Sequence, residues 1–299
     1  MINLEDELRN IKVSKKHNRR EDILIQISSS SYLVDSNGEN LRFASDKLPI
    51  SWHPNGDMFL AYDFNNKNKY SIIFEVYPEI KEVNTGKLLS AFAYSPKGNL
   101  TAEIESHGIK ITDKQKKSII IPSKKEFVFS PDEEYILTSE SFLGDKNIIY
   151  ELPLQEGKFY GENIRSMREI ENIGFFHWLD NTNIIVSPSF ENSYILDIFN
   201  GDKRELINAP AMVNVEVSPD KQFILFCDFN SECLRVVDYK NDKNVLTIYD
   251  TQAYFSWAPD SRRIAFTRYE NKDFQVYITD LRGDEMKIAK GVVRGWRPK

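Results

Sequence analysis

The chain has 299 residues and a formal net charge of −6, and 12% of its residues are aromatic. This net negative charge argues against bulk attraction to nucleic acid or to an anionic membrane. No stretch approaches the ~18 uncharged apolar residues of a membrane-spanning helix, so we expect no membrane span. The 19 Phe and 14 Tyr, against 5 Met, are typical of pleated strands and predict an all-β protein.

Residues 1–21 form a basic extension, in which Lys15, Lys16, Arg19 and Arg20 follow an acidic start. Apolar residues near helical spacing predict a short helix here, and a disordered segment is the alternative. The start has neither the basic region nor the apolar region of a secretory signal. We therefore expect a cytoplasmic protein.

Beyond this extension, an apolar or aromatic stretch stops seven times at a short turn signal, at intervals that average about 41 residues. A repeat of this length made of short strands indicates a β-propeller. The seven stops read Trp52-His53-Pro54-Asn55-Gly56, Tyr94-Ser95-Pro96-Lys97-Gly98, Phe129-Ser130-Pro131-Asp132, Trp178-Leu179-Asp180-Asn181, Val217-Ser218-Pro219-Asp220, Trp257-Ala258-Pro259-Asp260 and Trp296-Arg297-Pro298.

Each repeat predicts one blade of four antiparallel strands. In the unit that begins at Tyr254, strands are expected at 254–257, 263–267, 275–280 and 285–289. Proline ends the first strand because it fixes φ and lacks an N–H. The third strand repeatedly ends in an acid, which we interpret as the start of a turn rather than as part of a carboxylate cluster. These acids are Asp35, Asp113, Asp197, Asp238 and Asp280.

The two ends of the chain complement each other. Residues 23–27, 32–35 and 40–43 read as second, third and fourth strands without a first, and residues 292–298 read as a first strand alone. A shared blade would remove the free edge of an open ring. We therefore predict a single domain over 22–299, a seven-bladed propeller whose closing blade is shared by the N- and C-termini, with six blades as the alternative.

The interval before the fourth stop is the longest, and its surplus lies in residues 155–163. We expect a protruding loop there, and either a functional loop or a tolerated insertion would explain it.

The Ser-Pro-Asp turns at 130–132 and 218–220 and the Trp-Ala-Pro-Asp turn at 257–260 resemble those of TolB-like propellers and of the propeller domains of the prolyl oligopeptidase and dipeptidyl peptidase group. The resemblance implies a propeller fold over residues 22–299. The WD40-like Gly-His and Trp-Asp signatures are missing. The Gly-x-Ser-x-Gly nucleophile elbow of the peptidases is also missing, so their activity is not expected.

Two histidines adjoin predicted innermost strands, which border the central channel of a propeller. His53 and His177 are therefore candidates for the channel mouth, and a structural role is the simpler interpretation of each. No two histidines have metal-ligand spacing, so we expect neither a metal nor a cofactor. A metal-assisted hydrolase or lyase with a site at the central channel remains the alternative function.

Basic residues from both ends would meet at the closing blade. Lys15, Lys16, Arg19 and Arg20 would then lie near Arg294 and Arg297, as a positive patch on an acidic protein. Such a patch could hold an acidic protein segment or a phosphate-bearing ligand, and a solvated tail is the alternative.

The function favoured by the sequence is a non-catalytic binding or scaffold module. It would engage a protein or peptide partner through the loop face and channel mouth, because blades fix the frame while loops vary. We expect a monomer, and no binding of nucleic acid.

Overall fold

The computed structural model describes residues 22–63, 71–76, 80–83, 92–123, 126–139, 146–171, 175–188, 192–206, 209, 212–228, 231 and 233–298. The expected helix at 1–21, with Lys15, Lys16, Arg19 and Arg20, lies outside them. Every regular element in these residues is a β-strand. Within the same ranges no helix has the length and hydropathy required to cross a membrane.

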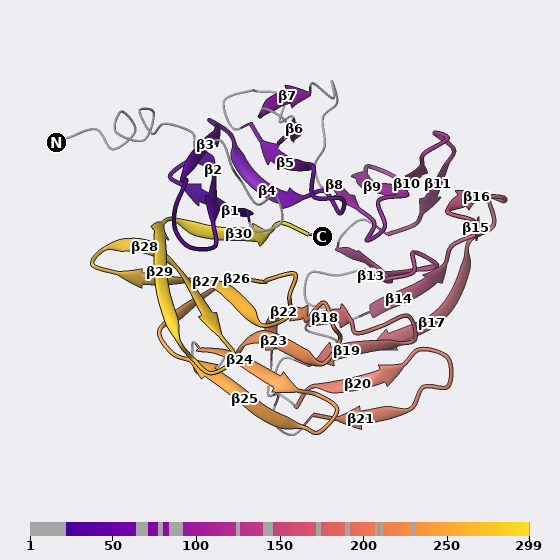
Figure 1. The fold of residues 1–299 in the computed structure, drawn as a ribbon. Helices are drawn as coiled ribbons and strands as arrows, with labels where there is room; N and C mark the ends of the chain where they lie inside the picture. Colours follow the sequence, from indigo (N-terminus) through magenta and orange to yellow (C-terminus); the bar gives the residue numbers. More distant parts are fainter. Residues whose placement is uncertain are drawn as a thin grey trace.

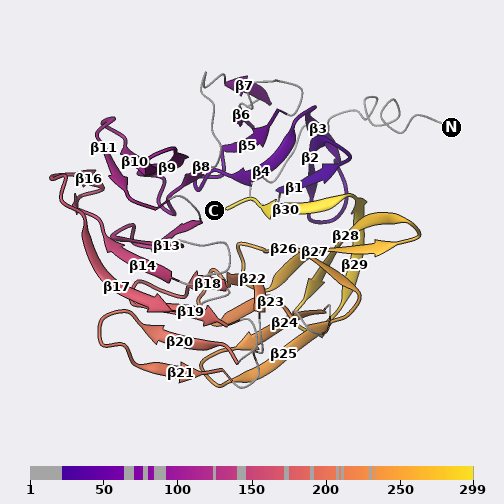
Figure 2. The ribbon, with the colours of Figure 1, turned by 180° about the vertical axis from the view of Figure 1, so that it is seen from behind.

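Seven four-stranded antiparallel sheets surround a central channel as the blades of a propeller (Figures 1 and 2). This confirms the all-β prediction and the count of seven blades over the alternative of six. Innermost strands follow each other around the channel, and the remaining strands of each blade lie progressively further out.

The closing blade is shared by the two ends of the described chain, as predicted. From the inside outward it contains β30 (Val292–Trp296), β1 (Asp22–Ile27), β2 (Ser30–Asp35) and β3 (Arg42–Ser45). Ile23 pairs with Trp296, and Gln26 pairs with Val292. The C-terminal strand therefore lies beside the channel (Figure 1).

The other six blades follow in chain order. Blade 2 contains β4 (Leu48–Trp52), β5 (Met58–Tyr62), β6 (Ser71–Glu75) and β7 (Lys81–Val83). Blade 3 contains β8 (Phe92–Tyr94), β9 (Leu100–Glu105), β10 (Gly108–Asp113) and β11 (Ser118–Ile121). Blade 4 contains β12 (Phe127–Phe129), β13 (Tyr135–Ser139), β14 (Lys146–Glu151) and β17 (Arg165–Glu171).

Blade 5 contains β18 (Phe175–Trp178), β19 (Asn183–Ser187), β20 (Tyr194–Asp197) and β21 (Lys203–Glu205). Blade 6 contains β22 (Met212–Val217), β23 (Phe223–Asp228), β24 (Cys233–Asp238) and β25 (Lys243–Ile248). Blade 7 contains β26 (Thr251–Trp257), β27 (Arg263–Glu270), β28 (Asp273–Asp280) and β29 (Glu285–Lys290).

The hydrophobic core is divided among the boundaries between blades. In β23, Ile224 and Phe226 pack toward blade 5, whereas Leu225 packs toward blade 7. All three side chains are fully buried. Successive residues of a strand point to opposite faces, so a continuous apolar run buries both faces of the blade.

The aspartates that end the third strands fix the following turns, as predicted. Asp113 Oδ1 accepts the N–H groups of Gln115 and Lys117 at 2.9 and 3.0 Å. Asp280 Oδ1 accepts those of Arg282 and Asp284 at 2.8 and 3.2 Å. Asp197 and Asp238 accept N–H groups of their own turns in the same way, whereas Asp35 Oδ2 accepts the side-chain amide of Asn40 at 2.7 Å. Bonding within the turn explains why the acids repeat with the blades.

The segment 155–163 differs from the protruding loop that was expected. It begins in a two-stranded hairpin of β15 (Leu154–Gln155) and β16 (Lys158–Phe159). Phe159 is 5% exposed within the core between blades 3 and 4. Its N–H donates to Asp113 Oδ2 at 3.0 Å. The hairpin therefore packs against blade 3, because the Phe159 side chain is buried in the core that the two blades share.

Candidate binding site at the channel mouth

One position of the innermost strands forms a layer around the channel. In each blade this position is the next-to-last residue of the innermost strand, and it pairs with a residue in the middle of the second strand. The layer consists of Ser51, Ala93, Val128, His177, Glu216, Ser256 and Gly295. Most of these residues are small or apolar, and the two with a titratable side chain occupy adjacent blades.

Two residues of this layer, Glu216 and Ser256, join their blade to the next. Glu216 Oε2 accepts the N–H of Trp257 at 3.0 Å, and Ser256 Oγ accepts the N–H of Trp296 at the same distance. The glutamate therefore takes a place that a serine fills one blade later. A carboxyl there keeps one hydrogen bond and brings an ionisable group to the channel.

Two of the four recurring tryptophans, Trp52 and Trp178, bond main-chain carbonyls of the same layer. Trp52 Nε1 donates to Gly295 O, and Trp178 Nε1 donates to Val128 O, each at 3.1 Å. Each indole thus bonds the innermost strand of the preceding blade. These contacts support a packing role for the two tryptophans at blade boundaries.

Four innermost strands carry a β-bulge above this layer. Ile50, Asn214 and Arg294 are each left without a partner residue on the second strand, in β4, β22 and β30 respectively. In β26 the register skips residues 252–254. Asn214 has a φ of 49°, a left-handed conformation that asparagine tolerates. Bulges redirect side chains and are frequent beside functional sites.

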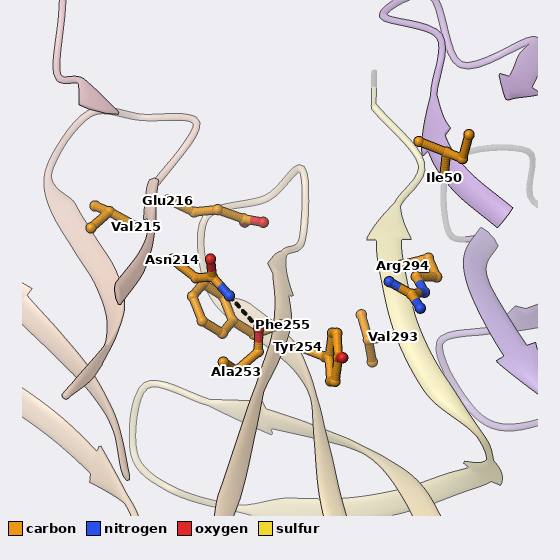
Figure 3. A pocket seen from close by; sticks show the side chains of 9 residues that line it. All are labelled: Ile50, Asn214, Val215, Glu216, Ala253, Tyr254, Phe255, Val293 and Arg294. Atoms are coloured by element: carbon orange, nitrogen blue, oxygen red, sulfur yellow. Dashed lines mark hydrogen bonds between the residues drawn. The ribbon is translucent and has the colours of Figure 1, made fainter. Parts of the chain in front are cut away.

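The bulged residues surround a pocket of about 420 Å³ at the channel mouth (Figure 3). We call it the channel pocket. Its walls come from the closing blade and from blades 2, 6 and 7, at the four strands that carry bulges. Its lining residues are Ile50, Asn214, Val215, Glu216, Ala253, Tyr254, Phe255, Val293 and Arg294.

Two apolar side chains of this pocket, Ile50 and Tyr254, are open to solvent. Ile50 is 40% exposed and Tyr254 is 39% exposed, although both belong to innermost strands. Asn214 Nδ2 donates to Ala253 O at 2.8 Å, which joins the bulges of β22 and β26 (Figure 3). An exposed aromatic ring on a fixed backbone is a suitable surface for a ligand.

Arg294 supplies a positive charge to the wall formed by β30. Its guanidinium lies over the Tyr254 ring, 5.1 Å from the centroid. Its Nε donates to Gln26 Oε1 at 3.0 Å, and its Nη2 donates to the same oxygen. Burial lowers the pKa of Arg294, and an arginine remains protonated throughout the physiological range.

Glu216 lies on the opposite side of the pocket from Arg294, in β22 (Figure 3). Burial raises the pKa of its carboxyl to about 7, and the N–H of Trp257 offsets only part of that increase. The carboxyl is therefore divided between its neutral and charged forms at neutral pH. Perturbed groups of this kind gather at functional sites.

The two predicted histidines occupy different places. His177 belongs to the layer and lies next to Glu216 in blade order, and burial lowers its pKa to about 4. His53 follows β4 at the turn after the innermost strand. Its ring contacts Tyr94 edge-on at 4.2 Å, and its Nδ1 contacts Asn55 Oδ1 at 2.6 Å. Neither histidine is among the residues that line the channel pocket.

The two described arginines of the predicted basic patch, Arg294 and Arg297, have different surroundings. Arg294 lines the pocket, whereas Arg297 is 4% exposed and pairs with Asp22 and Asp57, at 3.3 Å each. Arg297 therefore joins the closing blade to blade 2 instead of contributing to a positive surface. The other four members, Lys15, Lys16, Arg19 and Arg20, lie outside the described residues.

Sequence reasoning missed Glu216, Asn214, Tyr254 and Ile50. Glu216 could have been found by aligning the seven stops, since it is the acid in a layer of mostly small or apolar residues. The other three depend on bulges. The regular alternation of a strand does not reveal where a residue will be left unpaired.

No protein-family profile matches the chain, and no curated protein matches it. Among solved structures, it is similar to TolB from Acinetobacter baumannii, with a TM-score of 0.55 and 14% identity over 93% of this chain. The chain spans 66% of that TolB chain.

It is also similar to oligogalacturonate lyase from Vibrio parahaemolyticus, with a TM-score of 0.61 and 8% identity over 90% of this chain and 84% of the other. A third structure is the dihydro-heme d1 dehydrogenase NirN, with a TM-score of 0.64 and 11% identity over 95% of this chain and 76% of the other. These likenesses establish the propeller fold alone, because binding proteins and enzymes share it.

Proposed function

We propose that the protein is a non-catalytic binding module that holds a segment of a protein or peptide partner in the channel pocket. The observation that carries this proposal is the set of four bulges around one side of the channel. Bulges interrupt strand pairing, so four of them around one pocket call for a reason beyond stability. Recognition of a ligand is such a reason.

The chemistry of the pocket suits a short peptide. Tyr254 and Ile50 offer apolar contact area, while Asn214 and Arg294 offer polar groups at fixed positions. Binding sites commonly combine an apolar surface with a few oriented polar groups. A pocket of about 420 Å³ would take two or three side chains of a partner. In this proposal the protein acts as a monomer and does not bind nucleic acid.

Selection from a random peptide display library tests this function. The immobilised full chain should enrich peptides whose affinity falls at least tenfold with Tyr254→Ala. Tyr249→Ala is the matched control, because Tyr249 is 64% exposed and is not among the lining residues. Peptides that bind both variants as well as wild type, or a library without enrichment, would contradict the proposal.

A metal-assisted hydrolase or lyase is the second candidate. It is favoured by one observation, the adjacent positions of His177 and Glu216 in the layer around the channel. A neutral imidazole and a carboxylate are both competent metal ligands. Elemental analysis of protein purified without chelators, for wild type and His177→Gln, would reveal stoichiometric metal that depends on this histidine.

A further inference from the structure

Arg294 has no acidic partner among the described residues, whereas most arginines in the same ranges have one. Among the residues that the structure describes, ion pairs join seven other arginines to Asp or Glu. They are Arg42, Arg165, Arg235, Arg263, Arg268, Arg282 and Arg297. Within the same ranges Arg294 contacts only the neutral amide of Gln26 and the ring of Tyr254. Its charge therefore faces the pocket without compensation from a described carboxylate.

The guanidinium is also held in one orientation. Gln26 Nε2 donates to Ser28 O at 2.6 Å, which turns Gln26 Oε1 toward Arg294. That oxygen accepts from Nε and Nη2 on one edge of the guanidinium. The guanidinium also lies over the ring of Tyr254. An arginine that is fixed in this way loses little side-chain entropy when it binds a ligand.

The edge that remains available has the geometry for a carboxylate. A guanidinium has five N–H donors, and Gln26 uses one on Nε and one on Nη2. The Nη1–Nη2 end therefore keeps three donors for a ligand. Two parallel N–H bonds from this end match the two oxygens of a carboxylate.

A carboxylate fits this pocket better than a phosphate. The described lining residues hold one cation, Arg294, and one acid, Glu216, on opposite sides. A phosphate dianion would bring a second negative charge toward the Glu216 side without a second cation to balance it. A single carboxylate balances the single guanidinium.

We propose that Arg294 binds a carboxylate of the ligand through its Nη1–Nη2 edge, while Tyr254 and Ile50 contact the adjoining apolar part. This names the chemistry of the partner segment and so rests on the proposed function. The carboxylate comes from an acidic side chain or from a chain terminus, which offer the same group to the arginine. Gln26 is a positioning residue, because it acts through Arg294.

Titration of the full chain with small probes tests this directly. In ¹⁵N-labelled protein, the Arg294 Nε–Hε signal is assigned by its loss in Arg294→Gln. The probes are N-acetylglycine, with a terminal carboxylate, and N-acetylaspartate α-amide, with a side-chain carboxylate. N-acetylglycinamide and inorganic phosphate are the controls. Either carboxylate should shift this signal saturably, at least tenfold below the concentration at which the amide or the phosphate shifts it.

The difference between the two carboxylate probes assigns the source of the group. Arg294→Lys keeps the charge but loses the paired donors, and should weaken the better probe at least fivefold, as judged from the nearby main-chain signals. Gln26→Leu keeps Arg294 itself and should weaken that probe severalfold. Arg282→Gln is the matched control, since Arg282 is an exposed arginine outside the pocket, and it should change nothing.

Equal shifts with the amide, tighter binding of phosphate, or no saturable shift would overturn the inference. These outcomes are separate from failure of the proposed function. If the selected peptides depend on Tyr254 but not on Arg294, the proposed function holds and the carboxylate inference is wrong. If the carboxylate probes bind at Arg294 but no peptide is selected, the carboxylate inference holds and the proposed function is wrong.

Discussion

The Glu216 carboxyl accepts the main-chain N–H of Trp257 across the boundary between blades 6 and 7, at 3.0 Å. This bond places an acid where Ser256 serves one blade later. Because the pocket raises the pKa of Glu216 from 4.5 to about 7, the folded chain holds this proton more tightly than the unfolded chain. Stability is therefore tied to pH at this residue.

Glu216→Gln should stabilise the protein at pH 8. The glutamate costs no stability below pH 4.5, where both states are protonated, and the cost grows as pH rises from 4.5 to about 7. Above that range the gain for the variant should be on the order of 3 kcal/mol. Urea unfolding of both proteins at pH 5 and pH 8 measures it, and a gain that is the same at both pH values would contradict this account.

His177→Gln should produce the opposite trend. Burial lowers the pKa of His177 from 6.5 to about 4, so the unfolded chain takes up this proton first on acidification. The histidine therefore weakens the fold as pH falls from 6.5 toward 4, and the variant should resist acid better than wild type. In wild type, the effects of Glu216 and His177 on the pH dependence of stability oppose each other between pH 4.5 and 6.5. Unfolding profiles of both variants and their combination would separate them.

Arg297→Met should destabilise the closing blade by about 3 kcal/mol, because it leaves Asp22 buried with one of its two arginines removed. Arg165→Met is the matched control. The Arg165 side chain is 81% exposed and lies 3.9 Å from Glu151, so its loss should change stability by less than about 0.5 kcal/mol. Equal melting temperatures for the two variants would argue against this role of Arg297.

Phe159→Ala should cost about 3 kcal/mol, because Phe159 fills the core between blades 3 and 4. The adjacent Tyr160 is 70% exposed, so Tyr160→Ala should have almost no effect. Thermal unfolding of the pair distinguishes a hairpin that clasps blade 3 from a surface insertion. If Phe159→Ala unfolds like wild type, the hairpin contributes nothing to the ring.

The architecture could be predicted from the sequence because its signals are local and repeated. Short turn signals such as the one at Pro259 follow the innermost strands, and acids such as Asp280 bond their own turns. Seven copies in one register reinforce each other, so even the blade shared by β1 and β30 was foreseen. Repetition of this kind predicts the frame of the molecule.

The candidate site was predicted less well because it depends on departures from that repetition. Arg294 was proposed because of its charge. Its side chain lines the pocket because a bulge leaves this residue unpaired between β30 and β1, and the sequence does not predict that bulge. Arg297 was chosen on the same ground, yet Asp22 and Asp57 enclose it. These two arginines are three residues apart, and the sequence does not show which of them lines the pocket and which is buried between blades.

Site-specific photocrosslinking tests most directly whether a partner occupies the channel pocket. A benzophenone side chain would replace Ile50 in the pocket or Phe43 on the outer strand of the closing blade, which are exposed to similar extents of 40% and 42%. We predict one discrete adduct from position 50 in the native cell, lost when Arg294→Gln is added, and none from position 43. Adducts from position 43 alone, or no adduct from position 50, would contradict the account, whereas adducts from position 50 that persist with Arg294→Gln would contradict only the carboxylate inference.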